Sequence, residues 1–262
     1  MTAASVCRSP FTPVLATRDE AVCLLDEIIS LSQQAGSADP FRAQVLGQIE
    51  DEFGGVIAHA IVPRLDAVDL TVDRLKFIFA MSEADRGRGV LAGLPWLVVA
   101  RPELADQVAR RLRRAISRGN PLDVQAAARG VETWSSQIPK SLPHSLPESL
   151  VSTLVTAIEA ARLIGLQPLL WCTRRLFEGG FLSGEHISSI ALALGDLLKD
   201  LSYEAMPVDG PEAIGLTTAR AECVRLAHAF IEAGQGNESA KAWMELSATD
   251  PLPEVRSAVE SM

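Results

Sequence analysis

Apolar side chains recur along most of the chain at intervals of three and four residues, which places them on one face of an α-helix. Within residues 17–36, a stripe of Val22, Leu25 and Ile28 follows a Thr-x-x-Glu capping box and precedes a glycine. No pattern of strands alternating with helices is present, which disfavours doubly wound and barrel folds. The pattern therefore predicts an all-α protein.

Glycines, prolines and capping residues divide the chain into successive helices with short connections. Asp39-Pro40 predicts a helix start, and Gly54-Gly55 predicts a kink or break. The apolar run 89–100 fits either a helix or a buried strand, and we expect a helix because its neighbours are helical. The other predicted helices span residues 71–82, 102–118, 121–135, 150–164, 167–178, 183–201, 211–233, 237–247 and 251–261.

A proline-rich stretch at residues 136–147 interrupts this succession. Each of its three prolines removes a backbone donor and disfavours helix in the residue before it. The stretch predicts a linker, or a surface loop, between an N-terminal helical half at 1–135 and a C-terminal helical half at 148–262.

Three predicted helix starts are similar to one another: Asp39-Pro40, Asn120-Pro121 and Asp250-Pro251. The separations of their prolines are about two and three times a period of roughly 40 residues. The segment Asp-Pro-Leu-Pro-Glu-Val-Arg-Ser-Ala at 250–258 resembles the start of a HEAT repeat, in which Asp and Pro precede a helix carrying Val and Arg. The resemblance covers about nine residues, and residues 146–201 lack the signature.

This resemblance implies an irregular HEAT-like or armadillo-type α-solenoid of antiparallel helix pairs, in which each pair buries its apolar face against the next. One alternative is that Asp-Pro and Asn-Pro are common helix openings and that three copies arose by chance. Another alternative is a different helical bundle.

Charge affects the expected partner more than the expected fold. The 262 residues include 24 basic and 33 acidic side chains, a net charge of −9, which repels nucleic acid unless positive charges gather on one face. Residues 1–16 lack the apolar core that a secretory signal requires, and the uncharged run 89–100 is shorter than the roughly 18 residues of a membrane span. We expect a soluble, cytoplasmic protein without membrane or nucleic-acid partners. The Ala, Leu and Arg content is typical of a bacterial protein.

Reactive side chains are present, but not at catalytic or metal-binding spacings. The four cysteines lack a Cys-x-x-Cys pair, and the four histidines lack a His-Glu-x-x-His motif. Gly87-Arg88-Gly89 fits part of a dinucleotide-binding turn, but a helix precedes it, which favours an interhelical loop. Ser183 misses the nucleophile-elbow spacing and fits a helix N-cap. We expect no metal and no cofactor, and the sequence favours a non-enzymatic role.

The strongest local charge lies between Arg101 and Arg118, where six arginines accompany two acidic residues. Arg110, Arg114 and Arg118 follow i, i+4, i+8 and form one row, here called the arginine ridge. We expect the opposite side to face a core through an apolar stripe of Leu104, Val108, Leu112, Ala115 and Ile116. Arg111 is expected on the same polar side as the ridge. Guanidinium groups pair with carboxylates and phosphates, so the ridge predicts contact with an acidic partner surface. The alternative is a solvated helix face offset by acidic neighbours.

A second predicted contact combines Trp171 with Arg174 and Arg175. An aromatic side chain beside arginines is common at contact surfaces, although Trp171 could equally belong to the core of its helix.

These features predict a non-catalytic helical-repeat scaffold that binds a protein partner, or a helical module of a larger assembly. The alternative is a nucleic-acid-acting enzyme similar to the HEAT-like alkylpurine DNA glycosylases, which use a carboxylate and Trp side chains in a concave cationic face. Trp96, Trp134, Trp171 and Trp243 are available, but no Trp and Asp fall into that family's motif.

Overall fold

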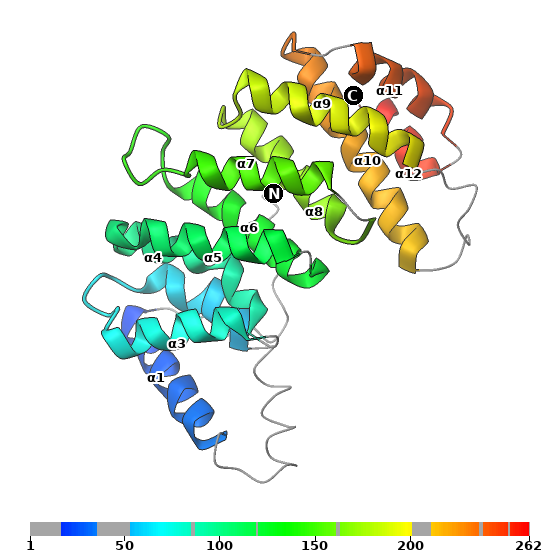
Figure 1. Cartoon of the computed structure of the whole chain (residues 1–262). Helices are drawn as coiled ribbons and strands as arrows, with labels where there is room; N and C mark the ends of the chain where they lie inside the picture. The colour runs from blue at the N-terminus through cyan, green and yellow to red at the C-terminus, as the bar shows by residue number, and fades with distance from the viewer. Residues whose placement is uncertain are drawn as a thin grey trace. The chain divides into compact units, whose positions relative to one another are not determined.

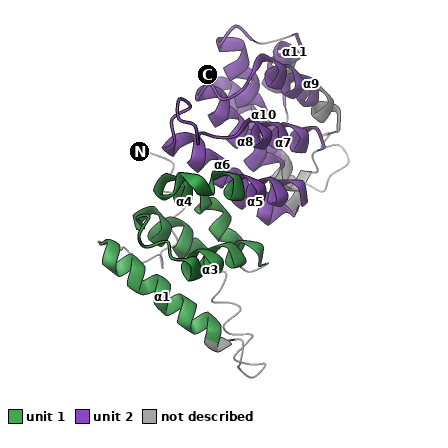
Figure 2. Cartoon of the chain, turned by 60° about the vertical axis from the view of Figure 1, so that its left-hand side comes forward, with its two compact units in different colours: residues 1–108 green, residues 109–262 purple. Residues whose placement is uncertain are grey.

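The computed structural model describes residues 17–35, 53–84, 87–118, 120–160, 163–200, 211–235, 238–250 and 252–261. Every regular element in these ranges is a helix (Figure 1), which confirms the all-α prediction for this part of the chain. The chain forms two compact units, Met1–Val108 and Ala109–Met262 (Figure 2).

The first unit combines α-helices with short π-helical and 3₁₀ turns. Its elements are α1 (Arg18–Ala35), η2 (Ile57–Ile61), η3 (Val62–Arg64), α3 (Val72–Glu83), η4 (Arg88–Ala92), α4 (Leu94–Ala100) and η5 (Pro102–Leu104). Helix α1 packs against α3 and η2, and α4 packs against η3 and η4. The run at 89–100 is therefore helical, as predicted, but it is divided between η4 and α4.

The predicted capping box opens α1. Thr17 Oγ1 accepts a hydrogen bond from the Glu20 amide at 3.2 Å, and Glu20 Oε2 accepts one from the Thr17 amide at 3.0 Å. Leu25 and Ile28 of the predicted stripe are fully buried. The local sequence thus determines both where this helix begins and which face it buries.

Of the kink or break predicted at Gly54-Gly55, a break does not occur. Residues 53–56 are helical and continue into η2 and η3. Close packing explains the glycine at position 54, because a Cβ there would lie 3.1 Å from the carbonyl oxygen of Gly87. A Cβ on Gly89 would lie 3.0 Å from the Gly54 carbonyl carbon. The Gly-x-Gly sequence at 87–89 therefore fits a loop packed on a helix.

Helix α5 (Ala105–Arg118) contains the division between the two units. The second unit continues with α6 (Pro121–Gln137), α7 (Glu148–Glu159), α8 (Leu163–Glu178), α9 (Gly184–Asp200), α10 (Pro211–Glu232), α11 (Glu238–Ala248) and α12 (Pro253–Glu260). Helix α8 packs against α6, α7 and α10, and α10 also packs against α9, α11 and α12. In this core the rings of Phe177 and Phe230 meet edge to face, with centroids 4.8 Å apart.

The connection between α7 and α8 differs from the predicted one. The predicted helices were 150–164 and 167–178. In the structure, α7 ends at Glu159 and α8 begins at Leu163, so that Pro168 lies inside α8. A proline close to a helix start removes only one of the first intrahelical hydrogen bonds, so the packing of α8 between its neighbours outweighs this loss.

The proline-rich stretch lacks regular helix between Gln137 and Glu148, as predicted. It is nevertheless packed, because Ile138 and Leu146 are buried and Trp134 Nε1 donates a hydrogen bond to the His144 carbonyl at 3.0 Å. The helices on both sides of it belong to the second unit, so the division within α5 differs from the predicted division at 136–147 into halves 1–135 and 148–262.

Asn120-Pro121 and Asp250 lie within the described residues, while Asp39-Pro40 and Pro251 lie outside them. Asn120 Oδ1 accepts from the Leu122 amide at 3.1 Å, and α6 begins at the following proline, as predicted. Asp250 Oδ1 also accepts from an amide two residues on, that of Leu252, at 2.9 Å. The helix there begins only at Pro253, two residues later than predicted.

Candidate functional site

The arginine ridge lies on α5, which separates its apolar and charged side chains onto opposite faces. Arg110, Arg114 and Arg118 are exposed. The residues of the predicted apolar stripe are buried: Leu104 at the end of η5, and Val108, Leu112, Ala115 and Ile116 on α5. Burial of that stripe orients the helix and therefore presents the ridge on the surface.

Arg111 does not share the surface with the ridge, contrary to the prediction. Its side chain is buried, with 6% of the residue exposed. A helix turns by about 100° per residue, which brings Arg111 next to the buried positions 108 and 115 and away from Arg110. Arg113 lies between these extremes and is half-buried, and its Nε has no hydrogen-bond acceptor in the described part of the chain.

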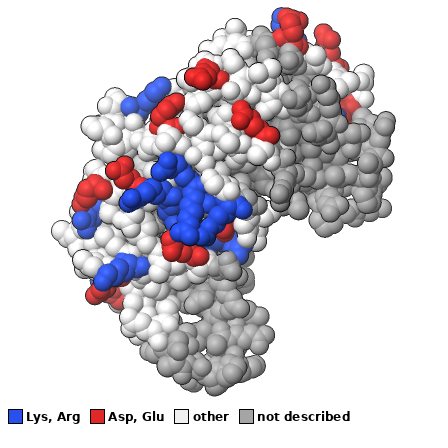
Figure 3. Space-filling model, in the orientation of Figure 1, with Lys and Arg blue, Asp and Glu red and all other residues white. Residues whose placement is uncertain are grey.

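Carboxylates of the described residues do not pair with every arginine of the ridge. Arg110 and Arg118 form no ion pair with any carboxylate of the described residues, whereas Arg114 has an interaction within the chain. The arginines that do form ion pairs with described carboxylates include Arg18, Arg74, Arg101, Arg174, Arg175, Arg220 and Arg225. Lys and Arg side chains gather on the surface over the α5 region (Figure 3).

The ridge is unfavourable for the stability of an isolated helix. Like charges at i and i+4 destabilise a helix by about 0.2–0.5 kcal/mol per pair, and Arg110, Arg114 and Arg118 form two such pairs. Arg118 gains from its place in the last turn, where the helix dipole favours a cation. This compensation does not reach Arg110, so helix stability alone does not explain the row.

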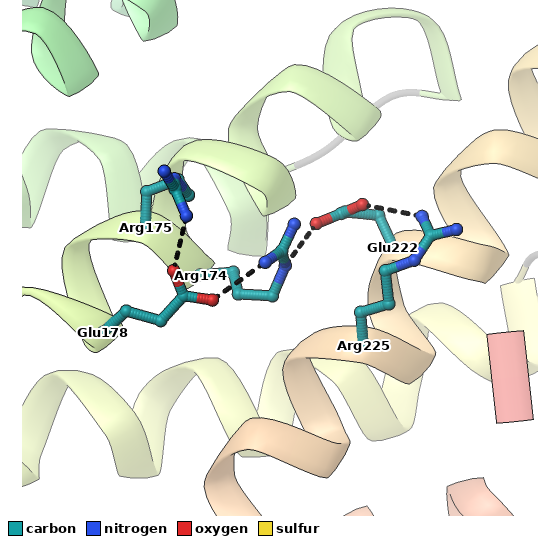
Figure 4. Close-up of polar contacts among 5 residues, drawn as sticks. All are labelled: Arg174, Arg175, Glu178, Glu222 and Arg225. Carbon is teal, nitrogen blue, oxygen red and sulfur yellow. Dashed lines mark hydrogen bonds and ion pairs between the residues drawn. The ribbon is translucent and has the colours of Figure 1, made fainter. Parts of the chain in front are cut away.

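The two arginines of the second predicted contact, Arg174 and Arg175, form ion pairs within the protein, on α8 and between α8 and α10 (Figure 4). Arg174 Nε donates to Glu222 at 2.7 Å, and its Nη1 donates to Glu178 at 2.8 Å. Arg175 also donates to Glu178 at 2.8 Å, and Arg225 donates to Glu222 at 3.0 Å. The Glu222 side chain is only 3% exposed. Arg174 therefore links two helices, and its contact with a partner stays a prediction.

The tryptophans give little support to a base-binding site. Trp134 is completely buried and its indole N–H is bound to a backbone carbonyl, so it cannot stack on a nucleotide base. Trp96 and Trp171 are half-buried, in the first and second unit respectively. The side chain of Trp243 lies outside the described residues.

A cluster of Glu148, Ser152, Ser183 and His186 was missed by the sequence analysis. His186 Nε2 lies 3.3 Å from both Ser152 Oγ and Glu148 Oε1, and Nδ1 accepts from the Ser183 amide at 3.3 Å. A neutral ring that accepts at Nδ1 carries its proton on Nε2 and cannot deprotonate Ser152 there. Because Ser183 Oγ accepts from the His186 amide at 3.2 Å, the cluster caps α9, as predicted for Ser183.

An open groove of about 600 Å³ runs between α1 and α3 in the first unit. Arg74 forms two hydrogen bonds with Asp26 at its wall, of 2.8 and 2.7 Å, and Ile29 and Phe77 add apolar surface. Its charges are of both signs, with Asp73 and Lys76 at its edge. This mixture does not select one class of ligand.

The described residues contain no group of three His, Cys, Asp or Glu side chains that could hold a metal ion. Burial raises the pKa of the Cys172 and Cys223 thiols, which keeps both protonated and unreactive. None of the described helices is long and apolar enough to cross a membrane. No family model matches the chain, and no curated protein sequence matches it.

Proposed function

We propose that the protein is a non-catalytic, HEAT-like helical scaffold that binds a protein partner through the arginine ridge. The carrying observation is that Arg110 and Arg118 are exposed and form no ion pair with a described carboxylate, in a chain with a net charge of −9. A concentrated positive row on such a protein would steer an acidic surface toward it.

The helix order supports the scaffold part of the proposal. In the second unit, α7 packs against α8 and α9, and α10 packs against α11 and α12. Contacts between helices close in sequence are typical of repeat proteins, whose successive pairs present an extended surface. We further propose a cytoplasmic location, which the free thiols of Cys23, Cys172 and Cys223 support.

The test is a pull-down from a lysate of the source organism with three forms of the full chain. The ridge variant carries Arg110→Glu, Arg114→Glu and Arg118→Glu. The lysine control carries Lys76→Glu, Lys140→Glu and Lys241→Glu at exposed positions and changes the net charge by the same amount. Circular dichroism verifies that both variants are folded.

The proposal predicts that the wild type and the lysine control recover the same protein and that the ridge variant does not. Equal recovery by a folded ridge variant would remove the ridge from the function. Recovery of no protein by the wild type, together with turnover of a substrate, would overturn the scaffold proposal as a whole.

A further inference from the structure

Arg113 combines a buried nitrogen with a half-exposed side-chain end on α5. Its Nε is buried and has no hydrogen-bond acceptor among the described residues, whereas its Nη atoms are not buried. The side chain also forms no ion pair with a carboxylate of the described ranges. Polar groups that are removed from water without a hydrogen-bond partner are rare, and a bound ion is one explanation for them. Arg113 therefore points to an anion at this surface.

Arg110 lies one helical turn before Arg113. Residues at i and i+3 are neighbours on the surface of a helix, with Cβ atoms about 5–6 Å apart. Arg110 is exposed, and it likewise forms no ion pair with a described carboxylate. Asp106, the one acidic residue of α5, lies a further turn before Arg110 and does not pair with it. Arg110 and Arg113, here called the arginine pair, are therefore two adjacent positive charges without a paired carboxylate among the described residues.

We infer that the arginine pair binds one phosphorylated side chain of the partner protein. This inference rests on the proposed function and specifies its partner. The arginine pair does not include Arg114, which already interacts within the chain.

The charge and shape of a phosphoryl group fit the arginine pair better than those of a carboxylate. A carboxylate carries one charge and can be bound by one guanidinium through two parallel hydrogen bonds, so it would leave the second guanidinium without a counter-charge. A phosphorylated side chain carries about −1.5 to −2 charges at neutral pH and three acceptor oxygens. It can therefore accept hydrogen bonds from both guanidiniums and balance both charges.

A protein fits better than nucleic acid as the carrier of this phosphoryl group. The net charge of −9 repels a polyanion, most of whose phosphates would lie beyond the two arginines. A single phosphorylated side chain places its charge at the arginine pair alone. The polypeptide around it can then contact neighbouring surface without adding to the repulsion.

The test measures binding of fluorescently labelled synthetic peptides to the full chain by anisotropy at low ionic strength, where charge contacts are least screened. The peptides share the sequence Gly-Ala-Ala-x-Ala-Ala-Gly with blocked ends and differ only at x, which is phosphoserine, Glu or Ser. A short single-stranded DNA is the fourth ligand.

Two variants of equal charge test the assigned residues. The pair variant carries Arg110→Gln and Arg113→Gln. The matched control carries Lys76→Gln and Arg129→Gln, again one exposed and one half-buried cation without an ion pair to a described carboxylate. Circular dichroism verifies folding. Arg110→Gln alone changes only an exposed side chain, so it keeps the test valid if the pair variant does not fold.

The phosphoserine peptide should bind about tenfold more tightly than the Glu peptide, the gain expected of one additional hydrogen bond to a charged group. The pair variant should lose this preference, Arg110→Gln should reduce it severalfold, and the matched control should retain it. Equal affinity for the phosphoserine and Glu peptides would overturn the inference. Tighter binding of the DNA, or an unchanged preference in the folded pair variant or in Arg110→Gln, would also overturn it.

Phosphatase treatment of the lysate separates this inference from the proposed function. The inference predicts that the treated lysate no longer supplies the partner to the wild type. If treatment has no effect but the ridge variant still loses its lysate partner, the phosphoryl inference is wrong and the proposed function stands. If the ridge variant keeps its lysate partner, the proposed function is wrong whatever the peptides do.

Discussion

Arg220 and Asp250 form an ion pair in which both side chains are buried, with exposed fractions of 6% and 0%. Arg220 Nε donates to Asp250 Oδ2 at 2.9 Å, and Nη2 donates to the same oxygen. The other carboxylate oxygen accepts from the Leu252 amide, and the Asp250 carbonyl accepts from Arg256 at 2.6 Å. One aspartate therefore joins α10 to the start of α12.

We predict that Asp250→Ala destabilises the second unit by about 3–5 kcal/mol, because it leaves the Arg220 guanidinium buried without its carboxylate. Urea unfolding followed by circular dichroism measures this change. Lys241→Ala breaks the exposed pair with Glu238 and serves as the control, with a loss below about 1 kcal/mol. A similar small loss for Asp250→Ala would contradict the assigned role.

Glu222 provides a second contrast, between α8 and α10. Glu222→Gln removes the charge that Arg174 and Arg225 bind, and we expect a loss of about 2 kcal/mol because hydrogen bonds to buried charged groups are strong. Glu178→Gln makes the same chemical change at a carboxylate that is 41% exposed, where the expected loss is below about 1 kcal/mol. Equal unfolding free energies for the two variants would show that burial of Glu222 is unimportant.

Gly93 separates η4 from α4 where another backbone passes close by. A Cβ on Gly93 would lie 2.5 Å from the Ala58 Cα. We therefore expect Gly93→Ala to lower the free energy of unfolding by about 1–3 kcal/mol through overpacking. Gly55→Ala is the matched control, because its Cβ would meet nothing within 4 Å and helical Ala is favoured over Gly by about 0.5–1 kcal/mol. The midpoint of thermal unfolding should therefore fall for Gly93→Ala and rise for Gly55→Ala, and shifts of the same sign would refute this account.

The first unit should lose stability in acid. The Arg18 hydrogen bonds lower the pKa of Asp69, and those of Arg74 lower the pKa of Asp26. Because the folded-state pKa values are depressed, the stabilisation is present above the unfolded value of about 3.9 and disappears as the pH falls through the lower folded values.

The measurement is urea unfolding of the wild type and Asp69→Asn between pH 7 and pH 2. The variant should be less stable at pH 7, and the difference between the two proteins should shrink as the pH falls below about 4. A difference that stays constant over the whole range would show that ionisation of Asp69 does not contribute.

The helix starts that the sequence predicted correctly depend on residues three or fewer positions apart. Thr17 with Glu20, and Asn120 with Leu122, form their caps within one turn, so the local sequence contains all the information. The wrong prediction at Gly54 has a different origin. Gly54-Gly55 was interpreted as a kink or break, but the small size of Gly54 serves the close approach of residues 87–89, which no local pattern contains.

The same distinction applies to the candidate site. The exposure of Arg110, Arg114 and Arg118 could be predicted because they lie opposite the buried stripe of α5, whereas Arg111 lies beside that stripe and was wrongly placed on the polar side. The bond from Arg174 to Glu222 could not be predicted, because it joins residues 48 positions apart, and the bond from Arg220 to Asp250 joins residues 30 apart. An arginine that stands out in the sequence can therefore be either an available contact or an internal link.

The central claim is that the ridge serves binding and not folding, and Arg110→Glu tests it most directly. Glu at this position is paired favourably with Arg114 at i+4, so the unfolding free energy should stay equal or rise by up to about 0.5 kcal/mol. The measurement is the Kd with which the partner protein recovered in the pull-down binds three forms of the chain: the wild type, Arg110→Glu and the exposed control Lys241→Glu. We predict at least a tenfold weakening for Arg110→Glu and an unchanged value for Lys241→Glu. An unchanged Kd for folded Arg110→Glu would contradict the account.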